Sequence, residues 1–179
     1  ALWFDRYNPM CDTYGVPWDT HTGELQSPIS MAGYIGNRCG MAGCYGVALK
    51  PIVVDDSDPT YPLASWQEAL EALTVVSGVD IIVPLSGDTP VWQLCSEHII
   101  SMRENQDERV AVFGADGSEG VVSPSTMIEY AKQLNDENLW LVSPSTFRFR
   151  NPFTNIIEVI PGYYGAVACA AYNSSVPQY

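Results

Sequence analysis

The sequence has few basic residues, and this shortage excludes several kinds of partner. Only eight lysines and arginines stand against 21 aspartates and glutamates in 179 residues, so the net charge is −13. A protein that binds nucleic acid on its own needs a basic surface, and so does one that binds an anionic membrane. The chain also contains no uninterrupted apolar run long enough to span a bilayer. We therefore expect no direct nucleic-acid binding and no membrane association.

The charge is distributed unevenly along the chain. Residues 1–50 carry four acids and three bases, residues 51–142 carry sixteen acids and three bases, and residues 143–179 carry one acid and two arginines. The middle segment therefore forms an acidic body between nearly neutral ends. Ends of this kind are often covered by another surface.

The chain contains five cysteines, an odd number, and their spacing does not indicate a metal site. Cys39 and Cys44 lie in a glycine-rich stretch, and no second pair or well-placed histidine completes a set of four zinc ligands. Cys95 and Cys169 lie in apolar segments, where a reduced cysteine acts as a small buried hydrophobic residue. We predict reduced cysteines in a reducing compartment and no metal ligands.

Residues 1–50 have no clear hydrophobic period. They contain three prolines, seven glycines and seven aromatic residues. This composition predicts an irregular or short-stranded segment that packs onto a partner surface through its aromatic side chains.

From residue 51 onward, strand and helix patterns alternate. Apolar runs predict strands at 52–54, 79–85, 109–113, 138–142 and 156–160. Capping boxes predict helices from Ser65 and from Thr126, the pair Thr89-Pro90 opens another, and residues 163–172 form a helix rich in small residues. This order predicts an α/β domain over residues 51–179, with a mostly parallel sheet and helices on both faces.

The loops that bind ligands in such folds do not match this sequence. The glycines at 114, 117 and 120 have the wrong spacing for a dinucleotide-binding loop, and two acids among them would repel phosphate. His98 lies beside the apolar stripe of its helix and is expected to be a flank or core residue. We nominate no catalytic residue, no cofactor and no metal ligand.

One acidic turn leaves an enzymatic alternative open. Asp56, Asp58 and Thr60 follow a predicted strand and resemble the D-x-D-x-T signature of haloacid-dehalogenase-like phosphotransferases. The resemblance implies a nucleophile at Asp56, an acid/base at Asp58 and a magnesium ion, and Ser86 could supply the phosphate-binding serine. That family is also expected to have a lysine followed by a late pair of acidic residues. This order is not found here, because Lys132 follows Asp116 instead of preceding it.

A second resemblance covers about two thirds of the chain, beyond residues 1–50. In order, the matching segments are Trp66–Leu73, Val79–Pro84, His98, Glu108–Gly114, Leu134-Asn135, Leu139–Pro144, Ile160–Ala171 and Val176-Pro177. Together they resemble the central region of contractile-tail sheath proteins of bacteriophages and related injection systems. The turn and helix that begin at Pro161, Gly162, Tyr163 and Tyr164 are the most specific part.

This resemblance implies a structural, non-enzymatic role. Sheath subunits assemble into stacked hexameric rings around a tail tube and rearrange on contraction to deliver the genome. The expected partners are other copies, the tail tube protein and baseplate proteins, in the virion tail and in the host cytoplasm during assembly. The chain would be the sheath-type core without the C-terminal domain that faces the tube. A sheath-like baseplate or tail-end protein would give the same pattern.

Two arginines near the C-terminal end are candidates for a contact between subunits. Arg148 and Arg150 flank Phe149 in a segment, 147–155, that we expect to be an exposed loop. Arginine and aromatic residues are enriched at interfaces, and acidic bodies need cationic contacts to approach each other. The alternative is a solvated loop whose arginines contact nothing.

Overall fold

The computed structural model describes residues 1–49 and 61–176, so the predicted strand at 52–54 lies outside the described part. The elements in chain order are β1 (Leu2–Phe4), α1 (Tyr7–Tyr14), α2 (Pro28–Arg38), β2 (Cys44–Gly46), α3 (Tyr61–Thr74), β3 (Ile81–Ile82), α4 (Thr89–Glu104), β4 (Val110–Gly114), α5 (Pro124–Leu134), β5 (Leu139–Val142), β6 (Thr146–Arg150), β7 (Ile157–Pro161) and α6 (Gly162–Ser175).

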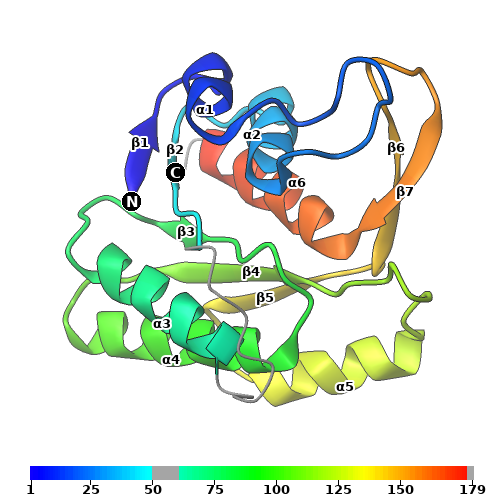
Figure 1. The fold of residues 1–179 in the computed structure, drawn as a ribbon. Helices are drawn as coiled ribbons and strands as arrows, with labels where there is room; N and C mark the ends of the chain where they lie inside the picture. The colour runs from blue at the N-terminus through cyan, green and yellow to red at the C-terminus, as the bar shows by residue number, and fades with distance from the viewer. Residues whose placement is uncertain (50–60, 177–179) are drawn as a thin grey trace.

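A three-stranded parallel sheet in the order β3-β4-β5 forms the centre of the fold. Helices α4 and α5 cover one face, and α3 packs on α4 (Figure 1). Helix α6 lies on the opposite face, with α2 and then α1 beyond it. The predicted α/β class and the helices on both faces are therefore confirmed.

The prediction of a mostly parallel sheet holds only for these three strands. The short strands β1 and β2 form an antiparallel pair, and β6 and β7 form another. Strand β7, which we expected in the main sheet, follows β6 after only six residues. A parallel crossover needs a dozen or more residues, so two strands this close in sequence pair as a hairpin.

Residues 1–49 are more regular than predicted, because they contain the helices α1 and α2. The side chain of Ser27 caps α2 by accepting a hydrogen bond from the backbone N–H of Ser30 (3.3 Å). Pro28 follows in the first turn, where its missing N–H is harmless. Gly33 and Gly36 weaken the helical pattern in the sequence, yet they let the side chains of Met10 and Met41 approach the helix closely.

Two helices begin earlier than their predicted capping boxes. Helix α3 starts at Tyr61, ahead of Ser65, and α5 starts at Pro124. The cap of α5 is Ser123, whose hydroxyl accepts from the N–H of Thr126, so Thr126 lies within the first turn. Helix α4 starts at Thr89 as expected, and its predicted inner stripe is buried: Val91, Cys95, Ile99 and Met102.

Candidate functional site

The carboxyl edge of the parallel sheet, where open α/β folds bind ligands, is filled by the protein itself. The N–H of Gly162, the first residue of α6, donates to the carbonyl oxygen of Ala115 just after β4 (2.9 Å). A side chain at Gly114 would collide with the backbone of Gly162, and one at Gly87 would collide with Asp116. The backbone segments thus pack directly on one another at this edge.

The motif at residues 161–164 accordingly has a packing role. Pro161 ends β7 and Gly162 is buried at the start of α6. The ring of Tyr164 is 1% exposed, and the centroid of the half-buried Tyr163 ring lies 4.8 Å from it. Burial raises the pKa of Tyr163 to about 12. These phenols are therefore neutral, structural groups near pH 7.

Small side chains bring α6 close to the sheet. Ala166 is 0% exposed and Ala170 is 7% exposed, and both pack with Val112 of β4. Cys169, on the same helix, is exposed, so the prediction of a buried cysteine is correct for Cys95 and wrong for Cys169. The five cysteines are all free.

The proposed contact residues lie on a strand, and the prediction of an exposed loop at 147–155 is wrong for its first half. Arg148, Phe149 and Arg150 belong to β6, which pairs with β7 along its whole length. Phe149 points inward and stacks on the buried ring of Trp18 with a centroid distance of 5.6 Å. Phe149 therefore holds the hairpin to the body, while the two arginines are exposed.

We call the solvent-facing side of this hairpin the ribbon face: Thr146, Arg148, Arg150, Ile157 and Val159. Alternate residues of a strand share a face, and the pairs Arg148–Val159 and Arg150–Ile157 lie side by side across the two strands. Val159 is 68% exposed and Ile157 is 53% exposed. The ribbon face thus combines two cations with two exposed aliphatic side chains and contains no acid.

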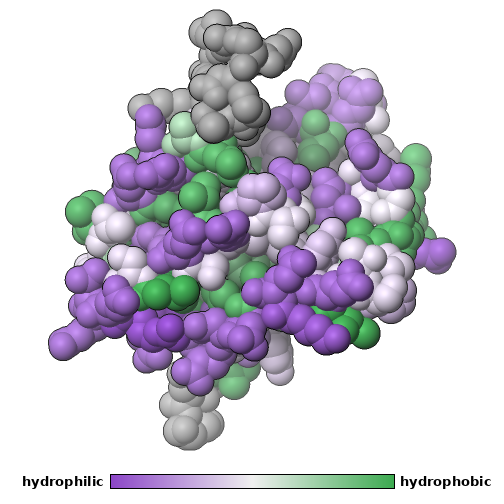
Figure 2. Space-filling view, turned by 90° about the horizontal axis from the view of Figure 1, so that it is seen from below, coloured by the Kyte–Doolittle hydropathy of each residue, from purple (hydrophilic) through white to green (hydrophobic). Residues whose placement is uncertain are grey.

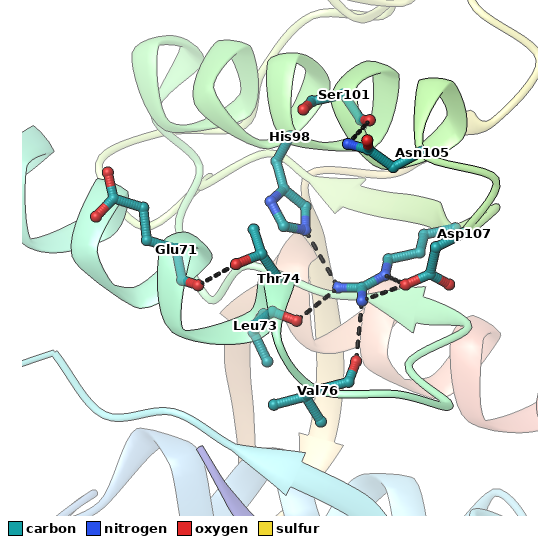
Figure 3. Close-up of polar contacts among 9 residues, drawn as sticks. Glu71, Leu73, Thr74, Val76, His98, Ser101, Asn105 and Asp107 are labelled. Carbon is teal, nitrogen blue, oxygen red and sulfur yellow. Dashed lines mark hydrogen bonds and ion pairs between the residues drawn. The ribbon is translucent and has the colours of Figure 1, made fainter.

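A buried arginine, which the sequence patterns did not single out, organises the opposite end of the sheet (Figure 3). Arg109 is 0% exposed and donates to the carbonyl oxygens of Leu73 and Val76, both at 3.0 Å. Its Nη2 donates to the Asp107 carboxylate at 2.6 Å, and its Nη1 donates to Nε2 of His98 at 3.3 Å. The cluster ties the end of α3 to α4 and β4.

His98 must be neutral in this arrangement, because its Nε2 accepts a hydrogen bond from a guanidinium that can only donate. Burial lowers the pKa of His98 below its ordinary value of 6.5, and the charge of Arg109 lowers it further. Every N–H of Arg109 has an acceptor within the cluster, which leaves no donor directed at a substrate. The cluster is therefore a structural tie.

The acidic turn at Asp56 and Asp58 lies outside the described residues, so its chemistry stays a prediction. The hydroxyl of Ser86, the suggested phosphate ligand, donates a hydrogen bond to the Asp88 carboxylate (3.0 Å) and accepts one from the Asp88 backbone N–H.

Within residues 1–49 and 61–176, no three histidine, cysteine or acidic side chains gather as metal ligands. In the same ranges, no helix has the length and hydrophobicity needed to cross a bilayer.

An apolar groove of about 720 Å³ separates α3 and β3 from β2, α2 and the end of α6. Trp3, Tyr45 and Trp66 line it, and Asp80 is the one charged residue among the described lining residues. Substrate pockets combine apolar walls with several converging polar groups. This groove lacks that combination among its lining residues and resembles a packing surface.

Acidic side chains gather on the outer face of α3, α4 and α5. Figure 2 shows this face from below, with hydrophilic side chains over most of it and isolated hydrophobic residues between them. The exposed acids of the three helices are Glu68, Glu71, Glu97, Glu104 and Glu129. This face is opposite in sign to the ribbon face.

Comparison with known proteins identifies one similar protein of named role. No protein-family model matches the sequence. The chain is 30% identical over 164 residues to the tail sheath protein of Mycobacterium phage Bxz1. The similarity covers 92% of this chain, so it reaches into residues 1–50, but it spans only 27% of that protein. The chain therefore corresponds to about a quarter of the length of this relative.

Proposed function

We propose that this chain is a structural part of a contractile tail sheath subunit. The observation that carries the proposal is the similarity to a tail sheath protein along 92% of the chain. The packing of the sheet supports a structural role, because the edge where an α/β enzyme would bind its ligand is filled by the backbone around Gly87, Gly114 and Gly162.

In this role, copies of the protein assemble into hexameric rings that stack around a tail tube. The rings rearrange on contraction and drive delivery of the genome. The partners are other copies of the subunit, the tail tube protein and baseplate proteins. The protein resides in the tail of the virion, after assembly in the host cytoplasm.

The ribbon face is the proposed contact surface between copies. Arg148 has no ion-pair or hydrogen-bond partner within the described part of the chain, and Arg150 is held by Asn155, whose carbonyl and side-chain oxygens both accept from its Nη1 at 3.0 Å. Phe149 supports the contact from inside by stacking on Trp18. The surface is thus rigidly backed and open to a partner.

Electron microscopy of the full-length protein tests this function. A sheath subunit is expected to form tubes or stacked rings. A protein that stays monomeric at every concentration and salt tested would contradict the structural role.

A further inference from the structure

The composition of the ribbon face indicates the chemistry of a surface that would fit it, and this inference rests on the proposed function. The face places Arg148 and Arg150 about 7 Å apart along β6, since alternate residues of a strand are separated by about 6.6–6.8 Å. Beside them on β7 are Ile157 and Val159, both more than half exposed. A matching surface would offer two carboxylates with an aliphatic side chain between them.

The outer stripe of α4 has this composition. Its exposed residues include Glu97, Ile100 and Glu104, which are three and then four residues apart and so lie on one side of the helix. Ile100 is 38% exposed and lies between the two glutamates along the helix. Seven residues of helix place the two glutamates about 10 Å apart, within reach of two long arginine side chains on neighbouring positions of a strand.

The charge of the chain favours a second copy as the source of this surface. Each copy carries a net charge of −13, so two copies repel unless a cationic surface of one meets an acidic surface of the other. Five bases lie elsewhere in the described part of the chain, but Arg103 is paired with Asp136 and Arg109 is buried. The ribbon face presents two exposed cations with no acid on the same face.

We propose that the ribbon face of one copy docks on the outer stripe of α4 of a second copy. Arg148 and Arg150 pair with Glu97 and Glu104, and Ile157 and Val159 cover Ile100. The two surfaces lie on different parts of the molecule (Figure 1). The contact is therefore heterologous, and repetition of a heterologous contact produces a closed ring or a helical array.

Charge reversal in the full-length protein tests the pairing. One variant carries Arg148→Glu and Arg150→Glu, a second carries Glu97→Arg and Glu104→Arg, and a third carries all four changes. We expect each double variant to stay folded by circular dichroism and to lower the assembled fraction by about tenfold or more, because like charges then face each other. The fourfold variant should recover most of the assembly.

A matched control places the same charge change elsewhere. Glu119→Arg with Glu129→Arg alters two exposed acids outside the stripe of α4, and it should leave assembly unchanged. Assembly is measured by sedimentation velocity and by electron microscopy of the same samples.

The outcomes separate this inference from the proposed function. If the unchanged protein assembles but the ribbon variant assembles equally well, or the fourfold variant recovers nothing, the pairing is wrong and the structural role stands. If the control lowers assembly as much as the α4 variant does, the effect is one of net charge and the pairing is again wrong. If the unchanged protein forms no particle, the proposed function itself fails.

Discussion

Helix α6 rests on the central sheet through very small side chains, and a tryptophan at Ala166 should disrupt that contact. Ala166 is 0% exposed and packs with Val112, which is also fully buried. An indole ring there finds no open space, so neighbouring side chains must leave their preferred rotamers or α6 must move. Overpacking of a core usually destabilises by about 1–3 kcal/mol, and we expect Ala166→Trp to reach about 3 kcal/mol. For a chain of this length, that loss lowers the melting temperature by about 6–12 °C.

The same helix provides the control. Cys169 is exposed, so Cys169→Trp adds the same side chain to the same helix and should change the free energy of unfolding by no more than about 0.5 kcal/mol. Ala170 borders the apolar groove, which gives a tryptophan there some room and predicts a smaller loss than at Ala166. Thermal unfolding followed by far-ultraviolet circular dichroism measures all three variants. Equal melting temperatures for Ala166→Trp and Cys169→Trp would refute the close packing of α6 on the sheet.

Three further predictions concern the buried cluster and the acidic turn. Arg109→Met removes the donors to the carbonyl groups of Leu73, which is buried, and Val76, which is partly buried, and should lower the free energy of unfolding by about 3 kcal/mol in urea titrations. Arg109→Lys should recover only part of this loss, because lysine lacks the planar guanidinium group. Unchanged stability of Arg109→Met would contradict the structural role of the cluster. The pKa of His98 in the folded chain lies below its ordinary value of 6.5. As the pH falls below about 6.5, the imidazole of His98 is therefore protonated in the unfolded chain before it is protonated in the folded chain, and the free energy of unfolding should decrease. His98→Gln should flatten this slope, and an unchanged slope in this variant would rule out His98 as its source. Asp56→Asn should leave assembly intact; magnesium-dependent hydrolysis of a phosphate ester that disappears in this variant would establish the phosphotransferase alternative.

The sequence correctly predicted the elements whose own side chains show a pattern of apolar or small residues. The inner stripe of α4 repeats at helical spacing and is buried as expected, from Val91 to Met102. The apolar run at 109–113 corresponds to β4, and the small residues after Pro161 correspond to α6. In each case, periodicity and burial reinforce each other within one segment.

The errors have identifiable physical causes. Strand β6 was expected to be a loop because arginines interrupt its apolar residues. In the structure, Phe147 and Phe149 alternate with these arginines, and the six residues between β6 and β7 allow the two strands to pair only as a hairpin. Helix α2 contains glycines that lower helix propensity and are tolerated because methionine side chains pack against them. The role of Arg109 was not predicted, because its partners include the backbone carbonyls of Leu73 and Val76, which are 36 and 33 residues away in the sequence. Backbone carbonyls do not contribute to a side-chain pattern.

A cryo-electron microscopy reconstruction of particles formed by the full-length protein tests the central claim most directly. The account predicts repeating copies in rings or a tube, with the β6–β7 hairpin at a contact between neighbouring copies. The account is contradicted if the protein forms no repeating assembly. It is also contradicted if an assembly forms in which Arg148 and Arg150 face open solvent in every copy.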